Sequence, residues 1–324
     1  MSRPLACAAV VLAAIPVFAQ SVVIPSAMSE TVSVGYVMIP FTVLGDRGKP
    51  ITDLRDAEVD LTVDGSPVSS DMFEKSENAP VSFTILLDGS GSMALAGKMD
   101  SARAAIGALI AHRRPGDDFA LYEFAESKAQ EVVPFTENPA DITRALARLT
   151  PYGKTAFFDA LSTMPERSRL GRNPSRAIIL LSDGIDNASS LTRGALAQQL
   201  QGISVPIYSL GLREPVESLN GGKRPREDLS DIGLLNEVAT LTGGKLYLGN
   251  TPQQIAEAVS HIEGDLRAQY LIGFAPTGKG AVKYRTISLK LNGRARAVRV
   301  RAGYLGTEPP LVAARNKRTE RKRS

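Results

Sequence analysis

Cysteine and histidine are scarce in this chain, and their scarcity removes several classes of chemistry. The 324 residues contain one cysteine, Cys7, and two histidines, His112 and His261. A disulfide framework or a thiolate metal site needs more than one cysteine. The two histidines lie in separate helical patterns, with no second histidine at ligand spacing. The chain therefore lacks most of the residues that a hydrolytic zinc site or a Ser-His-Asp triad needs, and we expect both histidines to be ordinary packing or surface residues.

Long apolar runs are also missing, apart from a short one at the start. Leu5 to Phe18 follows Arg3 and closes with small-residue spacing at Ala19. This pattern predicts a secretory signal peptide over residues 1–19; an N-terminal anchor or a buried helix is the alternative. No later stretch approaches the roughly 18 apolar residues that a membrane-spanning helix needs. We therefore expect an exported protein that ends in the periplasm, at the cell surface or outside the cell.

The charge is unevenly distributed. The formal charge is +4 overall, but residues 315–324 alone carry six basic residues and one acidic residue, and residues 20–314 carry a net −2. Residues 307–324 are predicted to be a basic disordered tail, either simply solvated or in weak contact with anionic groups of the cell envelope. No aromatic interleaving or second basic face accompanies the tail, so nucleic-acid binding is not expected.

The middle of the chain alternates short apolar runs with helical patterns. The runs cover residues 81–87, 119–124, 177–181 and 205–210, and the helical patterns cover residues 98–112, 140–149, 157–169 and 192–201. Strands that alternate with helices predict right-handed crossovers and a doubly wound, mainly parallel sheet covered on both faces. Two further helices, at 231–241 and 251–266, bracket a strand at 245–248, and residues 212–229 are predicted to be a loop.

The flanks of the chain have the alternation of antiparallel strands. Two or three strands are expected between Ser33 and Val63, with turns at Gly45–Gly48 and Asp64–Gly65, and three more follow residue 269, with a hairpin turn at Asn292–Gly293. The simplest architecture inserts the α/β domain in a small flanking antiparallel β unit. The expected organisation is a signal peptide (1–19), an N-terminal β segment (20–80), the α/β domain (81–265), C-terminal strands that pair with the N-terminal segment (266–306) and the tail (307–324).

Oxygen-bearing side chains gather where the predicted strands of the middle region end. The first strand runs directly into Asp88, Ser90 and Ser92, with glycines between them that permit a tight turn. A second strand ends in Ser182-Asp183-Gly184, and the loop before a third helix offers Thr155. Ligands of open α/β sheets sit at the carboxyl ends of the strands. Carboxylates and hydroxyls are hard ligands that suit Mg²⁺, Mn²⁺ or Ca²⁺, so the sequence predicts a divalent-cation site.

The order Asp-x-Ser-x-Ser, then Thr, then Ser-Asp-Gly resembles the metal-ion-dependent adhesion site of von Willebrand factor A domains, from about Val81 to Glu263. The chain looks most like the exported bacterial members, which share an early Val-Asp-Gly and a late Arg-x-Gly-Tyr at residues 301–304. The resemblance implies that Ser90 and Ser92 bind the metal directly, that Asp88 and Asp183 act largely through water, and that Thr155 joins in the ligand-competent state. It also implies that a carboxylate from a protein partner fills the open position.

Two details near this motif stay open at the level of sequence. Lys154 stands beside Thr155, where a cation either weakens metal affinity or helps to capture an anionic partner. Asp159 either supports the metal ligands or acts as a charge at the start of a helix, and Asp186 either touches a metal-bound water or is solvated.

Three classes of enzyme share part of these motifs, but the chain lacks a residue that each class requires. Gly153-Lys154-Thr155 looks like the end of a phosphate-binding loop, but Arg148 stands where that motif needs glycine. An aspartyl-phosphate phosphatase needs an acid where Ser90 stands. No Gly-x-Ser-x-Gly surrounds Ser90. The sequence therefore predicts a non-enzymatic, metal-dependent adhesion or complex-assembly module that binds an Asp or Glu carboxylate of a protein partner. The alternative is an envelope scaffold whose metal site is vestigial or only stabilising.

Overall fold

The computed structural model describes residues 36–46, 50–75, 79–201, 203–212, 226–249, 251–291 and 297–311. These residues belong to one compact unit. The predicted signal peptide, residues 213–225 of the predicted loop, the predicted hairpin turn at 292–293 and residues 312–324 of the predicted tail lie outside the described residues.

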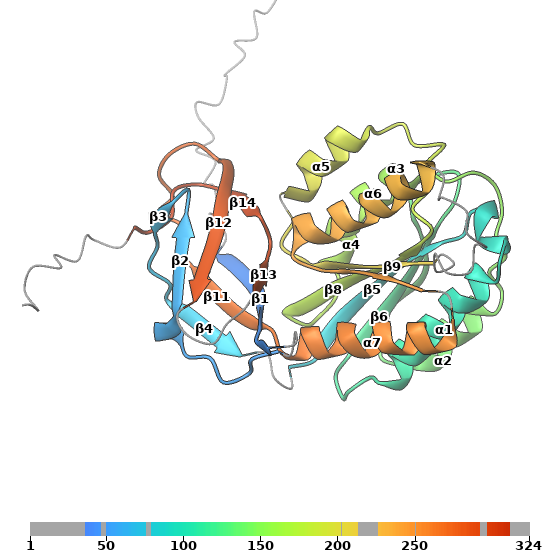
Figure 1. Cartoon of the computed structure of the whole chain (residues 1–324), viewed down its shortest axis with the longest axis horizontal. Coiled ribbons are helices and arrows are strands. Elements are labelled where there is room, and N and C mark those ends of the chain that lie inside the picture. Colours follow the sequence, from blue (N-terminus) through green and yellow to red (C-terminus); the bar gives the residue numbers. More distant parts are fainter. Residues whose placement is uncertain are drawn as a thin grey trace, which may run out of the picture. The chain divides into compact units, whose positions relative to one another are not determined.

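A six-stranded sheet forms the centre of the α/β part, with the strand order β10-β9-β8-β5-β6-β7 (Figure 1). All neighbours pair in parallel except β7, which runs antiparallel to β6 at the edge. The strands are β5 (Val81–Asp88), β6 (Asp118–Phe124), β7 (Gln130–Thr136), β8 (Ser175–Ser182), β9 (Ile207–Gly211) and β10 (Leu246–Leu248). The predicted doubly wound, mainly parallel fold is confirmed.

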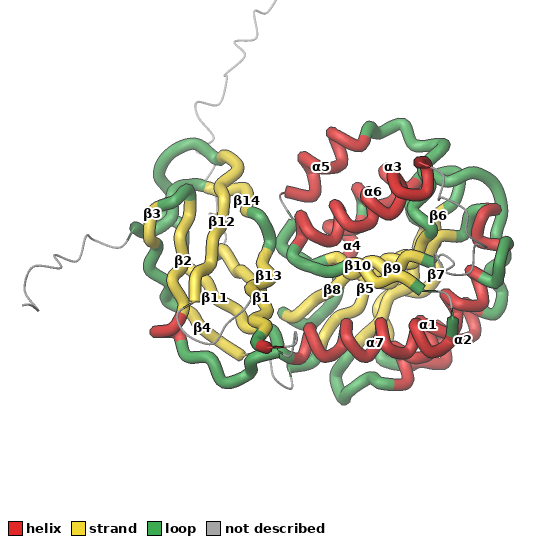
Figure 2. The backbone as a smooth tube through the Cα atoms, in the orientation of Figure 1, coloured by secondary structure: helices red, strands yellow, loops and turns green. Residues whose placement is uncertain are grey.

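Helices cover both faces of this sheet, as Figures 1 and 2 show. One face packs against α1 (Lys98–Ala111), α2 (Pro139–Leu146) and α7 (Pro252–Arg267). The other packs against α3 (Phe157–Ser162), α4 (Met164–Ser168), α5 (Arg193–Gln201) and α6 (Arg226–Thr242). All eight residues of β5 are buried. A central strand covered on both faces must be apolar on both, which is why its sequence reads as a continuous run rather than an alternation.

The flanking strands form two antiparallel sheets of four strands each. Their orders are β13-β1-β11-β4 and β14-β12-β2-β3. The strands are β1 (Val37–Leu44), β2 (Val59–Val63), β3 (Ser66–Pro67), β4 (Met72–Lys75), β11 (Tyr270–Phe274), β12 (Lys283–Leu291), β13 (Ala297–Val300) and β14 (Gly303–Gly306). One apolar core contains residues of both sheets, including Phe41, Leu61, Tyr270 and Leu289. Strands from the two ends of the sequence therefore bury one shared core, which neither end supplies alone.

Ion pairs join the sandwich strands and the α/β part within the described unit. The guanidinium of Arg299 on β13 forms a bidentate pair with Asp265 on α7, at 2.5 and 2.6 Å. Arg267, at the end of α7, pairs with the buried Asp117 and also donates to the carbonyl of Ala79. Asp117 in turn accepts from the backbone N–H of Val81 at 2.8 Å. These contacts fix the end of α7 against the start of β5.

Several element boundaries differ from the sequence prediction. The helix predicted over 157–169 is two helices, α3 and α4, separated at Thr163 with Pro165 in the first turn of α4. The predicted loop at 212–229 is too long, because α6 begins at Arg226. Strands β4 and β7 were not predicted at all. Strand β7 has exposed residues at Gln130, Glu131 and Pro134, so its sequence lacks the apolar pattern of a buried strand. A proline is typical of an edge strand.

Among the described residues, no helix combines the length and the apolar character needed to cross a membrane.

Candidate metal centre

Two adjacent parallel strands deliver carboxylates to the same edge of the sheet. Asp88 is the last residue of β5, and Asp183 follows the last residue of β8. Leu87 on β5 lies opposite Leu181 on β8, so the two strands end side by side. Strand β5 connects onward to β6 on its other side, and the chain order therefore reverses between β5 and β8. Such a switch point is where open α/β sheets bind their ligands.

The Asp88 carboxylate is fully buried and held by two hydrogen bonds. Its Oδ1 accepts from the backbone N–H of Ser90 at 2.9 Å, and its Oδ2 accepts from the hydroxyl of Ser182 at 2.6 Å. Burial raises the pKa of Asp88 to about 6, and the neighbouring charge of Asp183 raises it further, while the two serine hydrogen bonds oppose this shift. The site therefore contains a buried carboxyl group that a nearby positive charge would stabilise as the anion.

The two serines of the motif lie where the chain turns out of β5. Ser90 is fully buried, Ser92 is half-buried, and their hydroxyl oxygens lie 3.1 Å apart. A short 3₁₀ helix, η3 (Gly91–Ala94), begins directly after Ser90. This tight turn brings two hydroxyl oxygens close together beside the Asp88 carboxylate.

Hydrogen bonds tie the loop that carries Thr155 to the loops that follow β5 and β8. The backbone N–H of Gly91 donates to the carbonyl of Gly153 at 3.0 Å, and that of Tyr152 donates to Gly89 at 2.8 Å. On the other side, the side chain of Asn187 accepts from the backbone N–H of Thr155 at 2.8 Å. Thr155 itself is buried. The loop is thus braced against both strand ends.

A lysine, not predicted from the sequence, contacts the second carboxylate. The ammonium nitrogen of Lys98, at the start of α1, lies 2.7 Å from Oδ2 of Asp183. The side chain of Lys98 is 16% exposed and that of Asp183 is fully buried. Lys154, which the sequence analysis singled out, is exposed instead. The sequence holds no signal for the role of Lys98, because the helix that carries it returns to the site only in three dimensions.

The two other acidic residues near the motif bind backbone groups. Oδ1 of Asp186 accepts from the backbone N–H of Phe157 at 2.9 Å, at the start of α3. The two carboxylate oxygens of Asp159 accept from the backbone N–H groups of Ser190 and Leu191, at 2.9 and 2.8 Å. Both carboxylates therefore fix the loop after β8 to the first turn of α3. Asp159 and Asp186 therefore position the loops around the motif and are not among the five predicted ligands.

The chemistry of the donor set fits a hard divalent cation. The five predicted residues (Asp88, Ser90, Ser92, Thr155 and Asp183) offer two carboxylates and three hydroxyls, all of them oxygen donors. Among the described residues, no group of three or more His, Cys, Asp and Glu side chains is placed to hold a metal. The five predicted residues include only two carboxylates, so their affinity for a metal would depend on the three hydroxyls as well. Their role as ligands stays a prediction.

The two histidines lie away from this cluster. His112 faces Glu263, with 3.5 Å between Nδ1 and Oε2, and the ring of His261 stacks on Tyr247 at 6.0 Å between centroids.

The central segment of the chain matches the model of a known family. Residues 83–185 match the model of the von Willebrand factor type A domain, and no curated protein matches the chain. The solved structures it resembles include a von Willebrand factor type A protein from Catenulispora acidiphila (16% identity, TM-score 0.45, covering 85% of this chain and 74% of that one). They also include an aerotolerance-related membrane protein from Bacteroides fragilis NCTC 9343 (21% identity, TM-score 0.43, covering 57% of this chain and 98% of that one). A third is the vWF domain of the type V pili tip protein Mfa5 from Porphyromonas gingivalis (14% identity, TM-score 0.41, covering 57% of this chain and 94% of that one). The match to the family model carries the resemblance of residues 83–185 to this family.

Proposed function

We propose that this chain, in which residues 83–185 are a von Willebrand factor type A domain, is a protein-binding module that works through a divalent cation. The observation that carries the proposal is the burial of two adjacent carboxylates, Asp88 and Asp183, at the strand ends where α/β sheets bind ligands. Two buried like charges disfavour each other's ionisation, and a divalent cation between them removes that penalty.

The residues that would hold the cation are Asp88, Ser90, Ser92, Thr155 and Asp183. Mg²⁺ is the preferred cation, with Mn²⁺ or Ca²⁺ as substitutes, because all five donors are oxygens. The bound cation supplies one further coordination position and a positive charge. Five side chains leave an octahedral cation one ligand short, and an Asp or Glu side chain of a partner protein would fill that position.

The rim of the centre suits a protein partner. Leu95 follows the serine pair and is 64% exposed, and Tyr152, beside the Thr155 loop, is 52% exposed. Tyrosine is among the residues that protein interfaces favour, and Leu95 adds apolar surface. We infer that the partner segment around the carboxylate packs against these two side chains, while the carboxylate itself binds the cation. The signal-like segment at 1–19 supports an extracytoplasmic location, in the periplasm, at the cell surface or outside.

One observation favours a second candidate, a scaffold of the cell envelope whose metal site is vestigial. The ammonium of Lys98 already neutralises Asp183 at 2.7 Å, which provides a positive charge without any metal. The two candidates differ in what metal does. In a binding module the cation displaces or supplements Lys98 and creates a partner site, whereas in a scaffold it changes stability at most.

The test uses metal alone first and then an acidic probe. Mn²⁺ binding is followed by electron paramagnetic resonance on the wild type, on Asp88→Asn and Ser90→Ala, and on Lys290→Gln, an exposed lysine of β12, as the control. Binding is then measured on a surface carrying a glutamate-rich peptide and on its glutamine-substituted twin. The module requires Mn²⁺ binding that both site variants lose and glutamate capture that a chelator reverses. Metal binding without capture supports the scaffold, and the absence of any metal binding refutes the metal-dependent module.

A further inference from the structure

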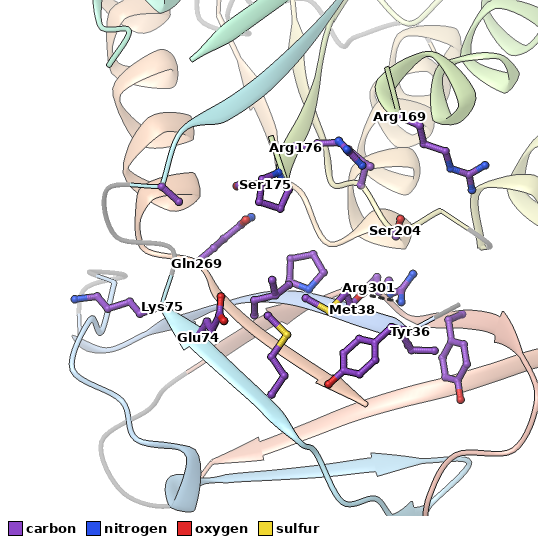
Figure 3. Close-up of a pocket in the computed structure, with 18 of the residues that line it drawn as sticks. Tyr36, Met38, Glu74, Lys75, Arg169, Ser175, Arg176, Ser204, Gln269 and Arg301 are labelled. Atoms are coloured by element: carbon purple, nitrogen blue, oxygen red, sulfur yellow. Dashed lines mark hydrogen bonds between the residues drawn. The ribbon is translucent and has the colours of Figure 1, made fainter. Parts of the chain in front are cut away.

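A second site lies at the opposite end of the same sheet. A cavity of about 600 Å³ opens where β1 and β11 of the sandwich face the first residues of β8 and the segment before β9. Ser175 and Arg176, which begin β8, line it, whereas the candidate metal centre lies beyond Ser182 at the other end of that strand. Figure 3 shows Arg169, Ser175, Arg176 and Ser204 on one side of the cavity and Met38, Glu74 and Arg301 on the other.

Arg301 in this cavity is a buried cation that has no acidic partner among the described residues. It is 4% exposed and donates to the backbone carbonyls of Ile203 and Met38, at 3.2 and 3.1 Å. Its Nε has no hydrogen-bond partner, and burial lowers the pKa of the guanidinium to about 10. Arg267 and Arg285 are as deeply buried, and each pairs with a carboxylate, Asp117 and Asp64 respectively. Buried charges are normally paired, so the isolation of Arg301 within the described structure requires an explanation.

Two buried hydroxyls around the same cavity also lack partners. Ser175 Oγ and the Tyr304 hydroxyl are both shielded from solvent and make no hydrogen bond in the described part of the chain. The guanidinium of Arg301 also lies over the ring of Tyr304, with its Cζ atom 5.9 Å from the ring centroid. Native proteins satisfy nearly all buried polar groups. Nine buried side-chain atoms of the described residues lack a partner, and three of them belong to residues that line this cavity, so its wall is richer in unused donors than the rest of the described structure.

The balance of charge and apolar surface defines the chemistry of the ligand. Arg176 adds positive charge to that of Arg301, whereas Arg169 is paired with Glu166 at 2.7 Å. Of the described residues that line the cavity, only Glu74 is acidic, and it is exposed. The remaining wall is largely apolar, from Val37, Met38, Pro40, Pro174, Val205 and Leu271. Its volume is within the range of small-molecule sites, about 300 to 1,000 Å³.

We propose that this cavity binds an amphiphilic anion, with a carboxylate or phosphate head at Arg301 and an apolar chain along β1 and β11. The head lies against the guanidinium of Arg301, the buried cation of the cavity wall. The apolar chain covers the side chains of Met38 and Leu271. Arg301 and Tyr304 belong to the Arg-x-Gly-Tyr segment, which the metal-dependent function does not use.

The test measures binding of four defined probes to the full chain by titration calorimetry, below their micellar concentrations and with a chelator present. Decanoate and decyl phosphate represent the two sources of an amphiphilic anion, while decanol lacks the charge and inorganic phosphate lacks the chain. We expect one or both amphiphilic anions to bind at least about tenfold more tightly than decanol and inorganic phosphate. Whichever of the two binds more tightly identifies the head group. Equal binding of decanol, or no binding of either anion, overturns the proposal.

Three variants locate the binding. Arg301→Gln removes the cation, Leu271→Trp fills the apolar end, and Arg176→Gln removes a partly exposed charge at the cavity wall. Arg144→Gln, an exposed arginine on α2, is the control. We expect Arg301→Gln and Leu271→Trp to lose about tenfold or more in affinity, Arg176→Gln to lose less, and Arg144→Gln and Asp88→Asn to bind as the wild type does. If Arg301→Gln does not fold, the other two variants decide. Unchanged binding by Leu271→Trp refutes the site.

Discussion

The Nζ atom of Lys98 lies 2.7 Å from Oδ2 of Asp183, within the cluster of oxygen side chains that resembles a metal centre. The lysine is largely buried and the carboxylate entirely so, which makes their attraction stronger than that of a surface pair. A cation of the chain itself therefore stands next to the place proposed for a divalent ion. A metal bound there would compete with the lysine for the charge of Asp183.

Replacing Lys98 should strengthen metal binding and weaken the metal-free protein. Lys98→Gln removes the competing charge, so we expect the Mn²⁺ dissociation constant to fall about tenfold, equivalent to about 1.4 kcal/mol. Without metal, the same variant leaves Asp88 and Asp183 buried without a cation and should lose about 3 kcal/mol of stability. Thermal unfolding with a chelator and with Mn²⁺ measures both effects. Lys290→Gln, at an exposed position of β12, is the matched control and should change neither. Weaker Mn²⁺ binding by Lys98→Gln would show that the lysine supports the cation instead of competing with it.

Stability of the metal-free protein should depend on pH through Asp88. Its pKa is about 6 in the folded protein, against 3.8 for an ordinary aspartate. The folded state therefore holds this proton more tightly than the unfolded state. The resulting stability is fully present below about pH 4 and is lost as the pH rises through 6, by about 2 to 3 kcal/mol.

Asp88→Asn isolates this contribution, because asparagine resembles the protonated carboxyl and cannot ionise. With a chelator present, the free energy of unfolding of Asp88→Asn minus that of the wild type should increase by about 2 to 3 kcal/mol between about pH 4 and pH 7.5. Denaturant titrations at each pH measure it. A difference that stays constant across this range would mean that Asp88 keeps an ordinary pKa.

The Arg267–Asp117 pair should be important for the stability of the fold. Both residues are buried, at 7% and 2% exposure, and Asp117 also accepts from the backbone of Val81. Asp117→Ala leaves the guanidinium buried without a charge partner, so we expect a loss of about 3 to 5 kcal/mol in urea unfolding. Asp100→Ala breaks the pair of Asp100 with Arg103 on the surface of α1 and should cost less than about 1 kcal/mol. Similar losses from the two variants would contradict the assigned role of burial.

Two glycine substitutions should act in opposite directions. Gly153 has φ +68°, and an added Cβ would lie 2.4 Å from a carboxylate oxygen of Glu126. Gly153→Ala should therefore destabilise by about 1 to 2 kcal/mol and disturb the Thr155 loop, with weaker Mn²⁺ binding.

Gly107 lies within α1, with no atom within 4 Å of an added Cβ, so Gly107→Ala should stabilise by about 0.5 to 1 kcal/mol. Urea unfolding measures both, and stabilisation by Gly153→Ala would rule out strain at that turn.

The sequence predicted the α/β fold well because its signals are local. The continuous apolar run of β5 and the alternation in β12 each reflect the burial of one strand, which neighbouring residues reveal. The edge strand β7 escaped prediction because three of its seven residues are exposed and one is proline. The break between α3 and α4 was missed because the helical pattern continues through Thr163, although Pro165 follows it.

By itself, the sequence determined which oxygen side chains follow which strands, from Asp88 to Asp183, and hence the family that the central segment resembles. Only the tertiary structure decided that Lys98 contacts Asp183, that Ser182 donates to Asp88, and that Arg301 is buried without a carboxylate. The physical reason is distance along the chain. Periodicity and turn chemistry report on residues a few positions apart, whereas a charge pair or an unpaired buried cation depends on which distant elements pack together.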